Sequence, residues 1–228
     1  MKNLKNLMKK FMVCALIAAF LVSLSPTQAN AASISSAQEV DTEESTESAE
    51  TDDDVEYLFI GDSLFVWMST MNFGATASSD RTVLEQTGDI YWCCRSGATL
   101  HNFKSVVKDT IAQFEDQKED IVVVYELGGN KASAISKDIK FVKSLIEDGW
   151  TVYMTDILPV NDSIPNKYDN DVLDAANEKI YESGVPVIKF NATVKKKYIN
   201  DTNDGVHFLS KTYKAWYKKI MKKIEASS

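Results

Sequence analysis

The chain has 228 residues, of which 25 are basic and 33 acidic, and its formal net charge is −8. With 44% hydrophobic residues it has the composition of a globular protein, and its acidic balance gives no reason to expect a nucleic-acid partner. Two histidines and three cysteines leave too few ligands for a dedicated zinc site, so no metal or other cofactor is expected.

Residues 1–31 have the pattern of a secretory signal peptide. Four lysines precede an apolar stretch from Phe11 to Leu24, and Ala29-Asn30-Ala31 is a small-residue cleavage site. A membrane anchor is the alternative, but the stretch is shorter than the roughly 18 residues of a spanning helix. We therefore expect a secreted, extracellular protein that is cleaved near Ala31 and has no stable membrane insertion afterwards.

Residues 32–56 carry ten acidic side chains and no basic one. Such a segment buries too little apolar surface to offset the entropy of ordering, so it is predicted to be a disordered linker. Removing the signal lysines and the linker acids leaves 21 basic and 23 acidic side chains in residues 57–228, a formal charge of −2. The acidity of the chain is therefore mostly a property of the linker.

Residues 57–228 alternate short apolar runs with amphipathic stretches, which is typical of a parallel sheet with helices on both faces. We predict a three-layer α/β/α domain with five parallel strands. The strands are expected at residues 57–60, 90–94, 121–125, 151–155 and 186–190. Helical spacing of apolar residues marks the stretches 103–114, 135–146, 170–182 and 209–224.

Only two cysteines lie outside the predicted signal peptide, and they are neighbours in an apolar run. Adjacent residues of a strand point to opposite faces, so a disulfide between Cys93 and Cys94 would require the strand to break. Two separately packed thiols are predicted. A redox pair is the alternative, although no Cys-x-x-Cys spacing supports it.

Polar signals follow four of the predicted strands. Ser63 follows the first strand, Gly97 the second, Asn130 the third, and the pair Asp204 and His207 follows the fifth. Ligands of open parallel sheets bind outside the carboxyl ends of the strands. These residues are therefore expected to meet at one edge of the sheet.

Three of these residues have the chemistry of a catalytic triad. A serine hydroxyl becomes a useful nucleophile when an imidazole takes its proton and a carboxylate orients that imidazole. Asp204 lies three residues before His207, an offset that lets its carboxylate fold back onto the imidazole within one turn. The alternatives are a helix cap at Ser63 and a simple turn at Asp204-Gly205.

Four strings of the chain together resemble the SGNH hydrolases, also called the GDSL esterase/lipase family. They are Gly61-Asp62-Ser63-Leu64, Gly97 within Ser96-Gly97-Ala98, Gly128-Gly129-Asn130 and Asp204-Gly205-Val206-His207. The resemblance spans residues 57 to about 220. It implies a flavodoxin-like α/β/α fold and the activity of a carboxylic ester hydrolase.

The resemblance also implies a role for each site residue. Ser63 would be the nucleophile, His207 the base and Asp204 its orienting acid. The oxyanion hole would consist of the backbone N–H groups of Ser63 and Gly97 and the side-chain amide of Asn130.

The chain departs from the family pattern after Asn130, where Lys131 replaces the usual aspartate. We expect that aspartate to serve as a local structural partner in the family. The aromatic residues Phe65 and Trp92, together with Trp67, are candidates for lining an acyl or sugar pocket, although places in the core suit them equally. His101 is expected to be exposed or to cap a helix.

These observations predict a secreted serine esterase of small acyl esters, with O-acetyl groups of carbohydrate or cell-wall glycan as the favoured substrate. The polar segment from Leu158 to Asp171 is expected to shape a glycan-binding rim. The alternatives are an acyltransferase to glycan hydroxyls, a lipase or lysophospholipase, and an inactive glycan-binding module. The sequence leaves the acyl chain length and the oligomeric state open.

Overall fold

A computed structural model of the protein describes residues 55–75 and 84–227. The predicted signal peptide and all but the last two residues of the predicted linker lie outside these described residues. Among the described residues, no helix combines the length and the apolar character needed to cross a membrane.

The centre of the domain is a six-stranded sheet with the order β2-β3-β1-β4-β5-β6. All neighbouring strands are parallel except β2, which pairs with β3 in the antiparallel direction. The five parallel strands have the doubly wound order that reverses direction after β3, so β1 lies at the topological switch point. The strands are β1 (Glu56–Gly61), β2 (Glu85–Thr87), β3 (Ile90–Cys94), β4 (Ile121–Glu126), β5 (Thr151–Thr155) and β6 (Val187–Ile188).

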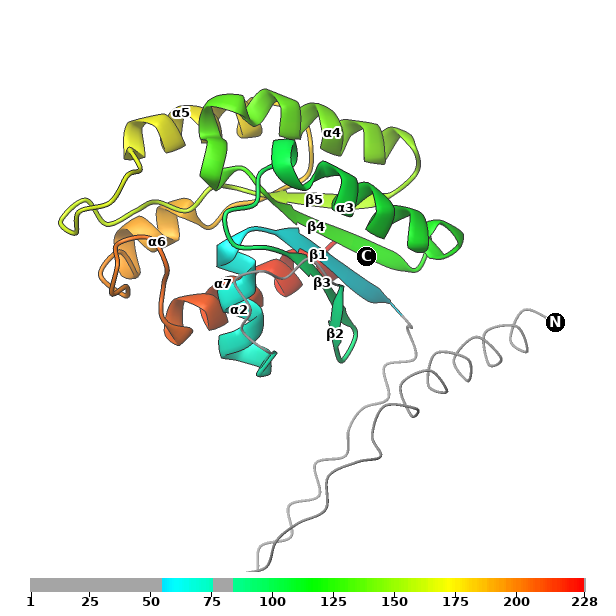
Figure 1. The fold of residues 1–228 in the computed structure, drawn as a ribbon, viewed down its shortest axis with the longest axis horizontal. Coiled ribbons are helices and arrows are strands. Elements are labelled where there is room, and N and C mark those ends of the chain that lie inside the picture. The colour runs from blue at the N-terminus through cyan, green and yellow to red at the C-terminus, as the bar shows by residue number, and fades with distance from the viewer. Residues whose placement is uncertain (1–54, 76–83, 228) are drawn as a thin grey trace, which may run out of the picture. The chain divides into compact units, whose positions relative to one another are not determined.

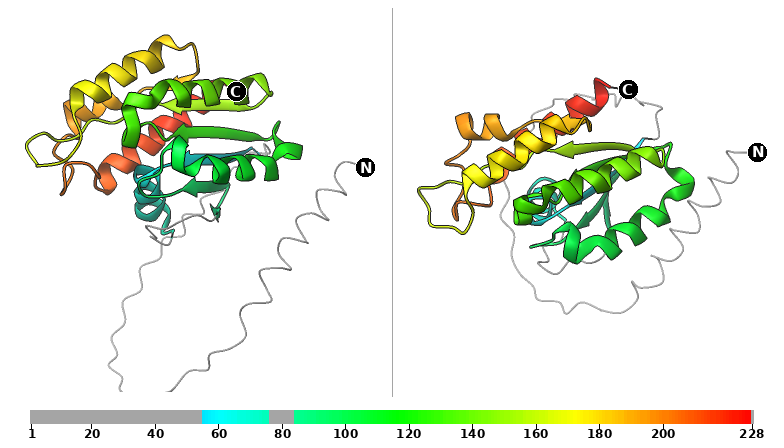
Figure 2. Two further views of the ribbon diagram at one scale, coloured as in Figure 1. Left: turned by 45° about the horizontal axis from the view of Figure 1, so that its top comes forward. Right: turned by 90° about the horizontal axis from the view of Figure 1, so that it is seen from above.

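Helices cover both faces of the sheet, as Figures 1 and 2 show. The helices α3, α4 and α5 pack on one face, and α2, α6 and α7 pack on the other. Their bounds are α2 (Ser63–Phe73), α3 (Leu100–Gln113), α4 (Ile135–Glu147), α5 (Asn170–Glu182), α6 (Asn191–Lys197) and α7 (Ser210–Glu225), with the short 3-10 helices η2 (Glu115–Gln117) and η3 (Gly129–Ala134).

The alternation of side chains along each strand divides the core into two layers. In β1, Leu58 and Ile60 are fully buried beneath α3 and α4, whereas Phe59 is fully buried in the layer of α2 and α7. Cys93 and Cys94 follow the same rule and pack in opposite layers, without a disulfide between them. The prediction of two separately packed thiols is therefore confirmed.

The turn from β1 into α2 brings Ser63 to the start of a helix. Asp62 is the N-cap of α2, and its Oδ1 accepts a hydrogen bond of 2.9 Å from the backbone N–H of Leu64. Gly61 lacks a Cβ where one would lie 2.6 Å from the ring of Phe65, so the strand can turn tightly into the helix. Ser63 is therefore the first helical residue rather than the cap.

The three-layer α/β/α prediction is confirmed, and the structure adds detail to the sheet. The additional strand β2 is polar, with the sequence Glu-Gln-Thr, and it lies at the sheet edge where no apolar alternation is required. The last strand is shorter than predicted because the N–H groups of Phe190 and Asn191 donate to the Asp156 carboxylate instead of to a strand. Glu56 belongs to β1 rather than to the linker.

Candidate active site

The structure brings Ser63, His207 and Asp204 together at the carboxyl edge of the sheet. The Ser63 Oγ lies 2.9 Å from Nε2 of His207, and Nδ1 of His207 lies 2.6 Å from Oδ2 of Asp204. Ser63 comes from the start of α2, whereas the other two residues come from the loop before α7. A hydroxyl, an imidazole and a carboxylate in this order form a path along which the serine proton can be transferred.

A compact turn holds Asp204 and His207 in place. Oδ1 of Asp204 accepts hydrogen bonds from the backbone N–H groups of Val206, at 2.9 Å, and of His207, at 2.7 Å. Gly205, which directly follows Asp204, has φ +81°, a left-handed conformation that favours glycine. Its carbonyl accepts a 2.8 Å bond from the N–H of Asn161, which ties the turn to the neighbouring loop.

The hydrogen bonds keep Asp204 ionised. Partial burial raises the pKa of Asp204, but the bonds from the His207 ring and from the two backbone N–H groups outweigh this effect and lower the pKa to about 2. Its charge therefore persists through the neutral range. A charged carboxylate at Nδ1 fixes the tautomer in which Nε2 is free to accept the Ser63 proton.

Three groups that can stabilise an oxyanion lie around Ser63. Backbone N–H groups in the first turn of a helix have no partner within that helix, and the N–H of Ser63 occupies such a position. Gly97 follows β3 with φ +70°, which favours glycine at this turn. Gly97 and Asn130 line the same pocket as Ser63 and His207.

The Asn130 side chain is held at both ends of its amide. Its Oδ1 accepts a 2.7 Å bond from the Tyr168 hydroxyl, and its Nδ2 donates a 2.7 Å bond to Oδ2 of Asp62. The second Nδ2 hydrogen is directed at the Ala98 carbonyl, at the longer distance of 3.2 Å. An oxyanion formed at Ser63 would compete for this weaker bond.

Behind Asn130 lies a buried pair of carboxyl groups, Asp62 at the end of β1 and Glu126 at the end of β4. Both are 3% exposed, and burial raises both pKa values, that of Asp62 to about 6 and that of Glu126 well above its usual range. The negative charge of Asp62 raises the Glu126 pKa further, while a hydrogen bond from Glu126 favours the ionised form of Asp62. At neutral pH Asp62 therefore carries the charge, and the Glu126 carboxyl is neutral and donates to it.

The candidate catalytic pocket is small, with a volume of about 350 Å³, and its lining combines polar groups with apolar surface. One wall comes from the loop between β5 and α5, which contributes Asn166, Lys167 and Tyr168. The ring of Trp67 also lines the pocket, with its centroid 6.0 Å from that of His207. The pocket therefore combines hydrogen-bonding groups with one exposed aromatic surface.

A much smaller apolar cavity of about 30 Å³ adjoins the same catalytic groups. It is bounded by Ser63 and Asn130 on one side and by Ile157, Leu158, Pro159, Val160 and Val206 among its apolar neighbours. A water-sized group needs roughly 10–15 Å³ of such volume. The cavity has room for two or three heavy atoms beside Ser63.

The structure corrects the placement of two aromatic residues. Phe65 and Trp92 are fully buried in the layer of α2 and α7, and neither lines the catalytic pocket. Phe65 points away from the pocket because it occupies the core-facing side of α2, and Trp92 lies in the middle of β3. Trp67, which is 38% exposed, is the aromatic residue of this group that reaches the pocket.

Sequence reasoning did not identify Glu126 or Tyr168 as parts of the site. The signal for Glu126 is a carboxylate at the end of an otherwise apolar strand, immediately before the Gly128-Gly129-Asn130 string. Tyr168 carries no comparable signal, since it lies in an irregular loop whose path depends on the tertiary fold. Lys131 and His101 are exposed and lie outside the catalytic pocket.

The fold is shared with solved structures of acyl-transferring and ester-cleaving proteins. A GDSL-like lipase from Bacteroides thetaiotaomicron has a TM-score of 0.57 at 14% identity, covering 77% of this chain and 90% of that one. The catalytic domain of peptidoglycan O-acetyltransferase A from Streptococcus pneumoniae has a TM-score of 0.55 at 16% identity, covering 75% and 93%. An acetyl xylan esterase has a TM-score of 0.51 at 13% identity, covering 74% and 98%.

These similarities establish the three-layer α/β/α fold seen in SGNH hydrolases. The sequence matches no protein-family model and no curated protein. The chain spans most of the length of each of these structures, so the fold accounts for nearly all of those domains.

A first prediction concerns Glu126 as the group that positions Asp62 and, through it, Asn130. Glu126→Gln retains a neutral donor of the same shape, so we expect kcat for p-nitrophenyl acetate within a few-fold of the parent. Glu126→Ala leaves the Asp62 charge without this donor, and kcat should fall by about 10- to 100-fold with little change in KM. Steady-state kinetics checks both values.

Glu147, which is exposed on α4, provides the matched control, and Glu147→Ala should leave kcat unchanged. Circular dichroism and thermal unfolding identify any variant that is not folded. An equal loss of kcat in Glu126→Gln and Glu126→Ala would contradict positioning by a neutral carboxyl group.

A second prediction concerns stability as a function of pH. An unfolded chain releases the Glu126 proton near pH 4.3, whereas the folded chain retains it to a higher pH, so the parent loses stability by up to about 1.4 kcal/mol per pH unit above that value. The Glu126→Gln variant has no proton to release at this position and therefore lacks this pH-dependent loss of stability. Urea unfolding at about pH 5 and pH 8 should show the variant gaining stability relative to the parent as the pH rises. Parallel pH profiles would mean that Glu126 is ionised in the folded state.

Proposed function

We propose that this protein is a secreted serine esterase of the SGNH hydrolase type that removes small acyl groups, with O-acetyl groups on carbohydrate as its substrate. The observation that carries the proposal is the continuous set of hydrogen-bonding distances from Ser63 through His207 to Asp204 at the carboxyl edge of the sheet. The fold neighbours named as lipase, O-acetyltransferase and acetyl xylan esterase support the same chemistry.

The first half-reaction forms an acyl-enzyme. Nε2 of His207 takes the hydroxyl proton as Ser63 Oγ attacks the ester carbonyl, and the C–O double bond becomes a single bond bearing an oxyanion. The N–H groups of Ser63 and Gly97 and the Asn130 amide are suited to stabilise that charge, each contributing on the order of 3 kcal/mol. Collapse of the intermediate breaks the bond to the alcohol, which leaves with the proton from His207.

The second half-reaction releases the acid. His207 removes a proton from a water molecule, which attacks the acyl carbonyl and forms a second oxyanion in the same position. Collapse of this intermediate breaks the bond to Ser63 Oγ, and His207 returns its proton to the serine. Asp204 stays ionised throughout because its pKa is low. Its negative charge is therefore suited to stabilise the imidazolium that forms in both steps.

The size of the apolar cavity beside Ser63 supports an acetyl group as the acyl part. Its volume of about 30 Å³ accommodates the methyl group of an acetyl ester, whereas a longer chain would have to displace the buried side chains around it. This observation also argues against a lipase or lysophospholipase, which requires an extended apolar surface for its acyl chain.

The polar wall of the catalytic pocket supports a carbohydrate as the alcohol part. Lys167 offers a donor for sugar hydroxyls, the Tyr168 hydroxyl, which donates to Asn130, offers an acceptor, and the exposed ring of Trp67 offers an apolar surface for a sugar face. The signal-peptide pattern of residues 1–31 further supports an extracellular location, where such substrates are found.

An acyltransferase to glycan hydroxyls would use the same acyl-enzyme. In that reaction a sugar hydroxyl replaces water in the second half-reaction, and the fold shared with a peptidoglycan O-acetyltransferase domain favours this second candidate. The ratio of acylated glycan to free acetate separates the two reactions, and acylated glycan as the main product would establish the transferase.

A third prediction tests the serine mechanism. The mature protein should hydrolyse p-nitrophenyl acetate faster than the butyrate or octanoate ester, and Ser63→Ala should reduce kcat by about a thousandfold or more because the nucleophile is lost. Ser105→Ala, an exposed serine on α3, is the matched control and should retain full activity. Activity that survives in a folded Ser63→Ala protein would overturn the proposal.

A fourth prediction tests the acyl cavity. Val160→Ala enlarges the cavity, and we expect the ratio of kcat/KM for butyrate to that for acetate to increase about tenfold. Val185→Ala is the control, because it removes the same atoms from a buried site away from the cavity and should cost a similar stability of about 2 kcal/mol. An unchanged ratio in Val160→Ala would show that the acyl group binds elsewhere.

A further inference from the structure

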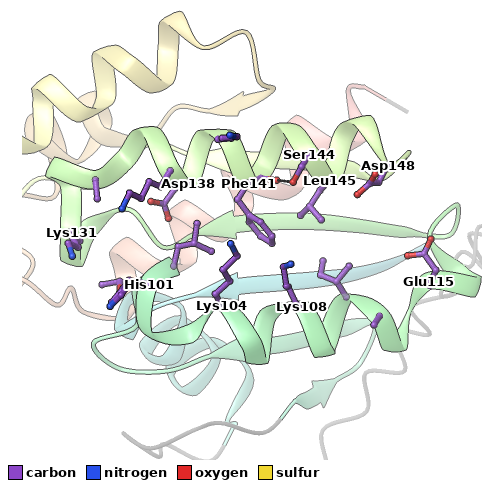
Figure 3. A pocket seen from close by; sticks show the side chains of 17 residues that line it. His101, Lys104, Lys108, Glu115, Lys131, Asp138, Phe141, Ser144, Leu145 and Asp148 are labelled. Atoms are coloured by element: carbon purple, nitrogen blue, oxygen red, sulfur yellow. Dashed lines mark hydrogen bonds between the residues drawn. The ribbon is translucent and has the colours of Figure 1, made fainter.

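A second and larger depression lies outside the catalytic pocket, between α3 and α4 (Figure 3). Its volume is about 690 Å³, roughly twice that of the catalytic pocket. We propose that this α3/α4 groove binds a carboxylate-bearing glycan strand, whose acylated sugar reaches Ser63 at the end of the groove. The proposal rests on the esterase function and identifies its substrate as an anionic polysaccharide.

The charge of the groove favours an anionic ligand. Its lining includes five exposed lysines, and Figure 3 shows those of α3, Lys104 and Lys108, pointing into the groove. Among residues 55–75 and 84–227, none of the five has an ion-pair or hydrogen-bond partner. Their positive charges are therefore available to a ligand. The five are Lys104, Lys108, Lys131, Lys137 and Lys140.

The acidic residues of the lining do not neutralise these lysines. Glu115 forms a 3.0 Å ion pair with Lys118, and Asp148 lies beside it at the far end of the groove. Asp138 is 4% exposed, and its carboxylate accepts a 2.7 Å bond from the buried Tyr125 hydroxyl. Figure 3 shows Lys131 and His101 at one end of the groove and Lys104 and Lys108 in its middle, whereas Glu115 and Asp148 lie at the other end, so the first end is the more basic one.

This basic end adjoins the catalytic pocket through the backbone. Lys131, which lines the groove, directly follows Asn130, which lines the pocket. Thr99, which also lines the groove, comes two residues after Gly97, which lines the pocket. Both segments that supply candidate oxyanion-hole residues therefore continue straight into the walls of the groove. A strand that presents an ester to Ser63 can extend from the pocket into the groove.

The shape and floor of the groove suit sugar rings. Buried apolar side chains of Leu100, Ile111, Phe141 and Leu145 line it, and the Phe141 ring points into it (Figure 3). Lys104 and Lys108 lie one turn apart on α3, a spacing of about 6 Å that lets them contact successive charged groups of a ligand. A polyuronate offers both features, apolar ring faces and regularly repeated carboxylates, and it also carries hydroxyls that can be acetylated.

The binding test uses the mature Ser63→Ala protein, which separates binding from turnover. Isothermal titration calorimetry with de-esterified polygalacturonate should detect binding that weakens as salt is raised, whereas neutral xylan should bind more weakly. When Lys104→Ala and Lys108→Ala are both introduced into the Ser63→Ala protein, the Kd for polygalacturonate should rise about tenfold. The matched control, Lys218→Ala with Lys222→Ala, removes two exposed lysines at the same spacing on α7 and should leave the affinity unchanged.

The kinetic test uses the same lysine variants with Ser63 intact. The groove variant should raise KM for acetylated polygalacturonate about tenfold, and it should leave kcat/KM for p-nitrophenyl acetate and for neutral acetylated xylan unchanged. If hydrolysis of p-nitrophenyl acetate is absent while polygalacturonate still binds in a lysine-dependent way, the proposed esterase function is contradicted, whereas the proposed ligand of the groove is supported.

Three outcomes would overturn the groove proposal. The first is no detectable binding of polygalacturonate by the folded Ser63→Ala protein. The second is an equal loss of affinity in the groove and control variants, which would indicate non-specific attraction. The third is tighter lysine-dependent binding of polyglutamate than of polygalacturonate, which would assign the groove to an acidic peptide.

Discussion

The hydrogen bonds around Asp62 join the parts of the molecule on which the site depends. Its Oδ1 caps α2 and so sets the start of the helix that carries Ser63, and its Oδ2 accepts the amide of Asn130 from beyond β4. The parallel register places Gly61 opposite Glu126, and Glu126 supplies both a backbone and a side-chain acceptor for the Asp62 N–H. A displacement of either strand end would therefore move Ser63 and the Asn130 amide relative to each other.

Two aspartates serve the site through opposite environments. Asp204 is half exposed, and its low pKa comes from hydrogen bonds within a short turn, so its charge costs little desolvation. Asp62 is buried, and its charge is tolerated because Glu126 remains protonated beside it and the Leu64 N–H and Asn130 amide donate to it. The first arrangement orients the His207 imidazole, whereas the second holds the Asn130 amide.

The parts of the structure that follow from local pattern could be predicted from sequence. Apolar runs such as residues 121–125 and amphipathic stretches such as residues 170–182 identified the layers, and the Asp204-x-x-His207 spacing identified a turn that is closed by local hydrogen bonds. Strand β2 and the wall residue Tyr168 escaped prediction because long-range contacts determine them. Phe65 and Trp92 were misplaced as candidates because hydrophobicity does not distinguish a core aromatic residue from one that faces a pocket.

Chemistry and substrate recognition are carried by different kinds of structure in this domain. The proposed nucleophile Ser63 and the proposed oxyanion donors Gly97 and Asn130 follow strands β1, β3 and β4, whose ends are held by the ladder of the sheet and by the buried carboxyl pair. The walls that would contact the alcohol part come from the loop before α5 and from exposed side chains of α3 and α4, which are not part of the sheet. A change of substrate therefore requires new residues on these walls, while the path from Ser63 to Asp204 can stay as it is.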